Sequence, residues 1–116
     1  MKYLLLMYAN ESEVPENMQD IAQVWAAFRE EIRVAGVLVS SGGVEPVSNA
    51  TTVRIRDGKS VITDGPFAET HEQLGGYFLV ECQDLDEAIS WAAKIPTAEY
   101  GSIEIRPLWS PKSQAG

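Results

Sequence analysis

The sequence is poor in the residues that build disulfides, metal centres and redox sites. Its 116 residues include a single cysteine, Cys82, and a single histidine, His71. One cysteine cannot form a disulfide within the chain, so we expect a reducing, cytoplasmic compartment. Glu69 and Glu72 flank His71, but this pattern is too common to indicate a metal site, which needs three or four ligands. We therefore predict neither a metal nor a cofactor.

Basic residues and long apolar runs are also scarce. Nine Lys and Arg stand against 17 Asp and Glu, which gives a formal net charge of -8. Because binding to phosphate backbones needs clustered basic side chains, this balance argues against nucleic acid and against anionic membranes as partners. No apolar run approaches the ~20 residues that cross a bilayer. We also find no phosphate-binding loop, dinucleotide fingerprint or nucleophile elbow.

Strand patterns recur along the whole chain. They occupy residues 3–8, 37–40, 51–62, 77–82 and 101–108. The runs at 3–8 and 77–82 are continuously apolar, which is typical of strands covered on both faces. Asp57-Gly58 predicts a two-residue turn in a hairpin over 51–62, whose alternating pattern predicts one exposed face that carries Arg54 and Arg56.

Two segments carry the spacing of amphipathic helices. The first spans residues 16–35 after Pro15, with the apolar stripe Met18, Ile21, Trp25, Phe28, Ile32 and Ala35. Because the whole stripe is apolar, we interpret Trp25 as a core residue rather than as part of a cofactor site. Asp84 and Glu87 form a capping box at the start of the second helix, which ends before Pro96. Trp91 lies outside its predicted buried stripe, which consists of Leu85, Ala88, Ile89 and Ala92.

The order of these elements predicts an α+β fold. Strand, helix, strand, hairpin, strand, helix and strand make a ferredoxin-like split βαβ sandwich with an inserted β-hairpin. We expect one domain over residues 1–109 and a flexible C-terminal tail over 110–116. The helices cover only one face of the sheet, although two strands are apolar on both faces. A second copy of the chain would cover the other face, so we predict a homodimer.

The segment from Thr63 to Tyr77 concentrates turn-forming and titratable residues. Its core, Asp64-Gly65-Pro66-Phe67-Ala68-Glu69-Thr70 followed by Glu72-Gln73-Leu74-Gly75-Gly76, resembles the DGPF branch of the YCII-related family. The resemblance extends over nearly the whole chain, through residues 36–39, 51–58, 84–88 and 101–107.

The resemblance implies a dimeric α+β barrel, in which two ferredoxin-like protomers pack sheet against sheet. Its wider superfamily includes small-molecule isomerases and cofactor-free monooxygenases, besides members without a known activity. An active site of one histidine and one aspartate has been suggested for the YCII-like branch, and DGPF proteins are often encoded beside extracytoplasmic-function sigma factors. That histidine belongs to the first helix, which contains none here, so its role does not transfer directly to His71.

Five residues are candidates for a functional site. At a strand end, the Asp64 carboxylate could act as a general acid or base, or could accept backbone amide hydrogen bonds and fix the turn. His71 could pair with Asp64, although its polar neighbours favour an exposed position. Glu69, Tyr77 and Arg106 are candidates for ligand binding.

Other features each allow a structural and a functional interpretation. Strand alternation places Tyr77 and Arg106 on the open sheet face together with Glu81 and Glu104. Ser41-Gly42-Gly43 predicts a bend or bulge, and glycines there could also let a ligand approach the backbone. Cys82 lies in an apolar strand, which favours a buried thiol over a nucleophile.

Two functions are consistent with the sequence. The first is a small-molecule protein, either a binding protein or a cofactor-free enzyme, with Asp64 at a cleft between sheet and partner. The alternative is a non-catalytic interaction module, linked to a sigma-factor circuit and marked by an exposed apolar patch that could include Trp91.

Overall fold

The computed structural model describes residues 1–13 and 18–111, which form an α+β fold with two sheets. The elements are β1 (Lys2–Ala9), α1 (Met18–Ala35), β2 (Leu38–Gly43), η1 (Val47–Asn49), β3 (Thr51–Arg56), β4 (Lys59–Asp64), β5 (Gln73–Glu81), α2 (Leu85–Lys94), η2 (Pro96–Glu99) and β6 (Ser102–Pro107). Residues 16 and 17 of the predicted first helix and residues 112–116 of the predicted tail lie outside the described residues. Among the described helices, none is long and apolar enough to cross a membrane.

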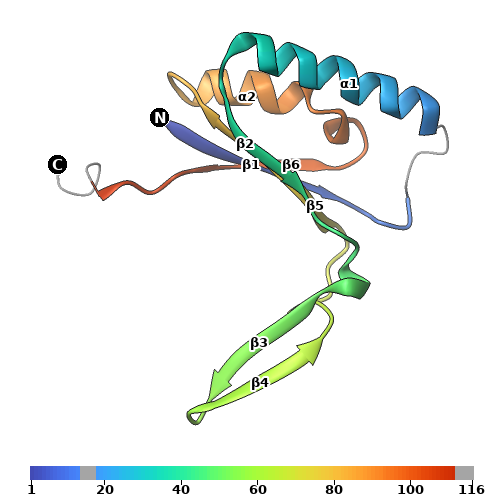
Figure 1. The fold of residues 1–116 in the computed structure, drawn as a ribbon, viewed down its shortest axis with the longest axis vertical. Helices are drawn as coiled ribbons and strands as arrows, with labels where there is room; N and C mark the ends of the chain where they lie inside the picture. Colours follow the sequence, from blue (N-terminus) through green and yellow to red (C-terminus); the bar gives the residue numbers. More distant parts are fainter. Residues whose placement is uncertain (14–17, 112–116) are drawn as a thin grey trace.

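The larger sheet has the strand order of a ferredoxin-like fold. It runs β2-β5-β1-β6, and every neighbouring pair is antiparallel. Figure 1 shows α1 and α2 together on one face of this sheet. The predicted split βαβ architecture is therefore confirmed, with the β3–β4 hairpin inserted between β2 and β5.

The hydrophobic core lies between this sheet and the two helices. Leu5, Ile32, Val80 and Ile95 are fully buried. Phe28 of α1 stands edge-on to Phe78 of β5, with ring centroids 5.3 Å apart. Each fully buried side chain of this size contributes roughly 1.5–3 kcal/mol through removal of apolar surface from water. The apolar stripe predicted for the first helix is thus confirmed at Phe28 and Ile32, which are buried, and at Trp25, which packs against the core, whereas Ala35 is exposed.

The buried face of the second helix is only partly the one predicted. Ala88, Trp91 and Ala92 are buried, whereas Leu85 and Ile89 are 48% and 47% exposed. Trp91 contacts Phe28 edge-on at 6.5 Å between ring centroids. The buried positions form an i, i+3, i+4 stripe in which the two alanines let the helix approach closely around the indole ring. The predicted stripe is therefore confirmed at Ala88 and Ala92 and wrong at Leu85 and Ile89.

Two glycine-containing segments are strands rather than loops. β2 continues through Ser41, Gly42 and Gly43, and its register irregularity lies between Leu38 and Ser40. β5 begins at Gln73 and includes Gly75 and Gly76, which we had expected in the loop before the strand. The predicted bend at 41–43 is thus wrong, because the paired glycines of the two strands approach closely enough to form a regular ladder.

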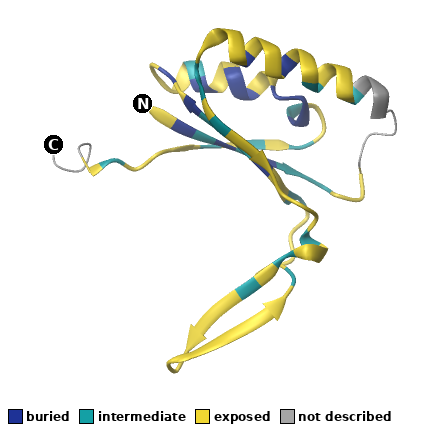
Figure 2. Cartoon of the chain, in the orientation of Figure 1, coloured by how far each residue is buried: buried dark blue, intermediate teal, exposed yellow. Residues whose placement is uncertain are grey.

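The β3–β4 hairpin projects from the rest of the molecule. Asp57 and Gly58 have φ of 53° and 75°, which are the left-handed values of the predicted two-residue turn. Figure 1 shows the hairpin on the side of the sheet away from the helices, and Figure 2 shows it almost wholly exposed. The radius of gyration is 16.7 Å, against about 13 Å for a compact domain of this length. Both faces of the hairpin are exposed in a single chain, where we had predicted one.

The second face of the larger sheet is not covered by any element of the described residues. Leu4, Leu6 and Tyr8 of β1 and Tyr77 and Leu79 of β5 alternate with the buried residues and are partly exposed. Leu6 is directly opposite Tyr77, and Leu4 is opposite Leu79. This surface is the one that the sequence assigned to a second copy of the chain.

Candidate functional site

The segment Asp64-Gly65-Pro66-Phe67 forms the base of the β3–β4 hairpin. Gly65 has φ of 105°, a backbone conformation that residues other than glycine rarely adopt. Its N–H donates to the Ala50 carbonyl at 2.7 Å, and the Thr52 hydroxyl donates to the Gly65 carbonyl at 2.8 Å. The Arg54 guanidinium donates to the Phe67 carbonyl at 3.2 Å. These bonds fix the chain where it leaves β4, and the glycine of the motif is required for this geometry.

The Asp64 carboxylate takes no part in holding this turn. Asp64 ends β4 opposite Thr51 and is exposed. Within residues 1–13 and 18–111, its side chain has neither a hydrogen bond nor an ion pair. The turn is fixed by its neighbours instead, through Gly65 and Thr52. The structural alternative, in which the Asp64 carboxylate accepts backbone amides, does not describe this position.

His71 lies in the loop before β5 and is exposed, as its neighbours predicted. Gln73 organises the loop, since its amide nitrogen donates to the Thr70 carbonyl at 2.6 Å and its amide oxygen accepts from the Glu11 N–H at 2.9 Å. Between Asp64 and His71, both in the described part of the chain, there is no hydrogen bond or ion pair. A single chain therefore does not form the predicted pair.

The three candidates for ligand binding lie in three separate places. Glu69 lines a shallow cavity of about 380 Å³ at the base of the hairpin. Arg106 lies on the open sheet face, where its guanidinium is 3.7 Å from the Glu104 carboxylate. Tyr77 alone lines the cavity described next. Their roles remain predictions.

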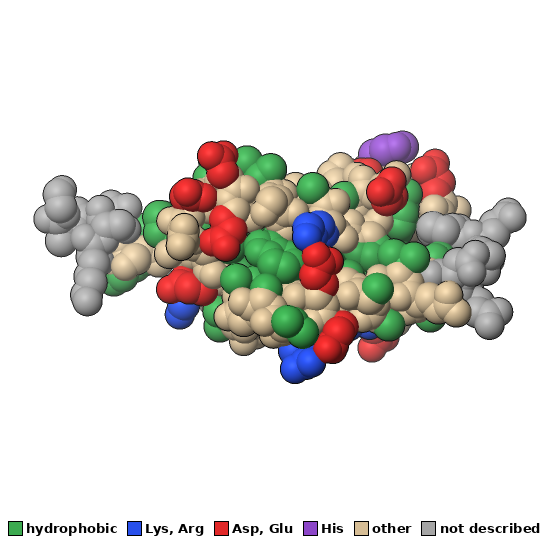
Figure 3. Space-filling view, turned by 90° about the horizontal axis from the view of Figure 1, so that it is seen from above, with side chains coloured by type: hydrophobic (Ala, Val, Ile, Leu, Met, Phe, Trp, Pro, Cys, Tyr) green, Lys and Arg blue, Asp and Glu red, His purple; other side chains and the backbone are tan. Residues whose placement is uncertain are grey.

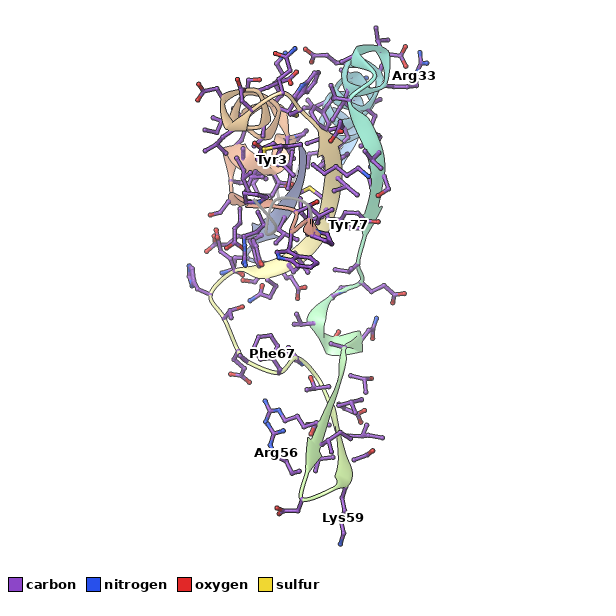
Figure 4. The ribbon with its side chains drawn as sticks, turned by 90° about the vertical axis from the view of Figure 1, so that its left-hand side faces the viewer. Tyr3, Arg33, Arg56, Lys59, Phe67 and Tyr77 are labelled. Carbon is purple, nitrogen blue, oxygen red and sulfur yellow. The ribbon has the colours of Figure 1, made fainter. Side chains whose placement is uncertain are left out.

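A cavity of about 340 Å³ lies between α1, η2 and the ends of three sheet strands. Its lining is Met7, Ala9, Trp25, Arg29, Ser41, Gly42, Gly43, Gly75, Tyr77, Phe78, Thr97 and Tyr100. The glycines of β2 and β5 leave room because they place no side chains at this end of the sheet. Figure 4 shows Tyr77 at the end of the layered body nearest the hairpin.

Aromatic rings and the guanidinium of Arg29 determine which ligands this cavity can bind. The Trp25 and Phe78 rings are stacked, with centroids 6.3 Å apart and planes 12° apart. The Arg29 guanidinium lies 5.2 Å from the centroid of the Trp25 ring, within reach of a cation–π interaction. The hydroxyl of buried Thr97 points to the Met7 sulfur at 3.8 Å. Such a site can hold a flat ring and neutralise a negative charge on it.

Sequence reasoning found this cavity only in part. Trp25 was interpreted as core, and it does pack on Phe28 and Phe78 while its exposed side lines the cavity. Arg29 was not singled out at all. The available signal was the run Ser41-Gly42-Gly43, whose functional interpretation was a ligand near the backbone. A second signal was the spacing of Trp25 and Arg29, which places them one turn apart on the same helix face.

Two titratable groups outside this cavity have shifted pKa values. Burial, assisted by the hydrogen-bonding Glu104 carboxylate, raises the pKa of the Tyr8 phenol on the open sheet face. Burial, followed by the negative charge of Glu87, raises the pKa of the Cys82 thiol. Cys82 is buried in the core, as predicted, and its raised pKa disfavours the nucleophilic thiolate. In residues 1–13 and 18–111, no three His, Cys, Asp or Glu side chains lie together as a metal site would require.

The sequence is similar to one protein family and to a curated bacterial protein. The sequence matches the model of the YCII-related domain over residues 1–112. It is 37% identical to the uncharacterised protein R00369 of Rhizobium meliloti (strain 1021), over 93% of this chain and 92% of that protein.

A solved structure has a similar fold at low sequence identity. It is 5-chloro-2-hydroxyhydroquinone dehydrochlorinase of Burkholderia phenoliruptrix AC1100, in complex with 2,5-dihydroxybenzoquinone. The similarity has a TM-score of 0.52 and 14% identity, over 97% of this chain and 98% of that one. At this identity the likeness concerns the fold alone.

Proposed function

The chain belongs to the YCII-related family, and we propose that it binds a small, flat, negatively charged aromatic or quinonoid molecule. The site is the cavity of about 340 Å³ between α1 and the sheet. The observation that carries this proposal is the convergence of the stacked Trp25 and Phe78 rings with the Arg29 guanidinium on one cavity, whose lining also includes Tyr77.

The size and charge of the cavity support this class of ligand. Cavities for small ligands are mostly apolar, start at roughly 300 Å³ and contain a few polar groups that fix orientation. In a chain of net charge -8, the described lining carries a guanidinium but no carboxylate. An anion would therefore meet its counter-charge here, and an aromatic ring would meet the exposed side of Trp25.

The ligand of the similar structure fits this description. 2,5-Dihydroxybenzoquinone is a single flat ring with acidic hydroxyl groups, and it is bound by a protein of similar fold. Because the two chains share only 14% identity, this ligand supports the class of molecule and not a shared reaction.

The described lining favours binding over acid–base catalysis by a single chain. It contains no carboxylate, imidazole or thiol, and its titratable groups besides Arg29 are the phenols of Tyr77 and Tyr100. Asp64 remains the predicted general acid or base, with His71 as its predicted partner, in any reaction that a second copy would complete. Asp64→Asn would then leave ligand affinity unchanged and reduce turnover.

We also retain the homodimer as part of the proposal. The partly exposed apolar side chains of β1 and β5 occupy the sheet face opposite the helices. A second copy that packs its own open face there would remove these side chains from water. The result would be the dimeric α+β barrel that the family resemblance implied.

The alternative function is an interaction module linked to a sigma factor. Its predicted exposed patch does not include Trp91, which is buried. An exposed apolar patch is present instead on the β3–β4 hairpin.

Titration with 2,5-dihydroxybenzoquinone tests the proposed function. Ligand entry should quench the fluorescence of Trp25, and calorimetry should give the affinity independently. Arg29→Gln should weaken binding at least about tenfold, because a charge-assisted contact contributes roughly 1.5–3 kcal/mol and about 1.4 kcal/mol is a factor of ten.

The matched control is Arg33→Gln, one turn further along the same helix. Arg33 is exposed and paired with Glu30 at 2.6 Å, so its loss changes the net charge equally but leaves the cavity intact. Equal effects of the two substitutions, or no binding by the wild-type chain to this quinone and to 2,5-dihydroxybenzoate, would refute the proposal.

A further inference from the structure

The β3–β4 hairpin carries an apolar surface that nothing in its own chain covers. Val53, Ile55 and Ile62 are 60%, 59% and 66% exposed. Val53 and Ile62 are directly opposite each other, and Ile55 follows on the same face by strand alternation. Phe67 at the base of the hairpin is 76% exposed (Figure 4). We call the surface formed by Val53, Ile55 and Ile62 the arm face.

An isolated two-stranded hairpin is not expected to be well ordered in water. Its two strands pair only with each other among the described residues. Two-stranded hairpins are marginally stable alone and need a third strand or a packed face for stability. The pairing is nevertheless complete from Thr51↔Asp64 to Arg56↔Lys59. A partner that covers the arm face would supply the missing packing.

The charge of the hairpin points to a second copy of this chain as that partner. Residues 51–64 contain three basic and two acidic side chains, Arg54, Arg56, Lys59, Asp57 and Asp64. Of the chain's nine basic and 17 acidic residues, this leaves six basic against 15 acidic elsewhere. Figure 3 shows acidic side chains spread over the helical side of the molecule, and the open sheet face also carries the exposed acidic residues Glu81 and Glu104. A basic arm is thus complementary to the body of another copy and not to a second basic arm.

The direction of the hairpin supports the same partner. The hairpin extends on the side of the larger sheet that the helices leave open (Figure 1). A copy seated on that open face would lie beside the hairpin, so the two surfaces would form one continuous interface. In a two-fold dimer each chain would contribute one arm and receive the other.

We propose that the β3–β4 hairpin is a dimerisation arm, whose arm face packs on the body of a second copy of this chain. The inference rests on the proposed homodimer but goes beyond it, since a sheet-to-sheet dimer does not require the arm. The arm would bury the three apolar side chains of the arm face on each protomer and would hold the basic side chains near acidic ones.

Sedimentation equilibrium of three full-length proteins tests the arm. The wild-type chain is compared with the double variant Val53→Ser and Ile62→Ser, and with Val61→Ser as control. Val61 is in the same hairpin and 44% exposed, but lies opposite Arg54 on the reverse face. We expect the double variant to dimerise at least about tenfold more weakly, and the control to change by less than about threefold.

Hydrogen exchange of the wild-type protein provides a readout that needs no variant. The amides bonded between β3 and β4 belong to a hairpin that is only marginally stable alone, so they should be strongly protected only in the dimer and lose protection on dilution. Circular dichroism checks that the variants retain the fold.

The possible outcomes distinguish a failure of the proposed arm from a failure of the proposed dimer and from a failure of ligand binding. A wild-type dimer that both variants leave unchanged would overturn the arm and leave the sheet-to-sheet dimer standing. A chain that is monomeric at about 100 µM, which corresponds to association too weak for a specific interface, would overturn both. Protection of the hairpin amides in a monomer would also overturn the arm, while quinone binding is measured independently.

Discussion

Two consecutive glycines illustrate how closely single residues are constrained at the end of the sheet. A Cβ on Gly76 would lie 2.6 Å from the Gly42 carbonyl oxygen and 2.8 Å from the Met7 side chain. A Cβ on Gly75 would meet only the Met7 carbonyl oxygen, at 3.9 Å, which is an ordinary contact. Gly76 therefore sets the spacing of β1, β2 and β5, whereas Gly75 borders the open cavity.

Substitution by alanine should separate these two roles. Gly76→Ala should lower the free energy of unfolding by about 2 kcal/mol or more, since the strands must move apart to admit the methyl group. Gly75→Ala should change it by less than about 0.5 kcal/mol, as expected for a position with open space. Urea unfolding measures both, and equal losses in the two variants would show that the close packing at Gly76 does not determine stability.

The candidate site was harder to predict than the fold because its residues serve two purposes. Trp25 belongs to the predicted apolar stripe and also lines the cavity, and periodicity reports only the first role. Asp64 stood out because its motif is rich in turn residues, yet the positive φ of Gly65 explains much of that pattern. A sequence records which residues are unusual, but the cavity depends on where glycines leave space between strands.

At the scale of elements, the Asp84 cap of α2 is the clearest local signal that the structure confirms, with Glu87 accepting from the residue before the cap instead of from Asp84 itself. The Asp84 carboxylate accepts from the Glu87 N–H at 2.9 Å, and the Glu87 carboxylate accepts from the Gln83 N–H at 2.7 Å. Both acidic residues also interact favourably with the positive end of the helix. The helix start could be predicted because it depends on residues within one turn of each other.

The loss of this cap should be measurable against a neighbouring acid. Asp84→Ala should reduce the free energy of unfolding by about 1 kcal/mol, because a backbone N–H of the first turn loses its acceptor. Asp86→Ala removes the same charge from the first turn without a capping bond, so it should cost only about 0.3 kcal/mol. Thermal or urea unfolding gives both values, and a cost for Asp86→Ala as large as that for Asp84→Ala would contradict the capping role.

The buried face of α2 and the exposure of the hairpin were beyond local reasoning. Leu85 and Ile89 are more apolar than Ala88 and Ala92, but the smaller pair faces the sheet because Trp91 fills the space beside Phe28. Alternation in the hairpin correctly predicted its strands and its turn, but not what covers its apolar face. Both outcomes depend on contacts between elements that are distant in sequence.

At the scale of the whole molecule, the separation of charge between arm and body gives the proposed dimer a dependence on salt. Arg56 lies in the arm, where its guanidinium donates to the Ile55 carbonyl at 2.9 Å along the strand edge. Figure 4 shows Arg56 and Lys59 well away from the layered body of their own chain. Their positive charge is therefore available to an acidic partner.

Neutralising this charge should weaken association at low ionic strength and have little effect at high. Arg56→Gln should reduce the dimerisation constant about threefold to tenfold in dilute buffer, and the difference should disappear near 1 M salt, where the Debye length is about 3 Å. Arg33→Gln removes the same charge from the helical face and should leave dimerisation unchanged at every salt concentration. Sedimentation equilibrium over a salt series measures all three proteins. If Arg56→Gln and Arg33→Gln behaved alike, the attraction would reflect net charge alone, and the arm would have no specific electrostatic role.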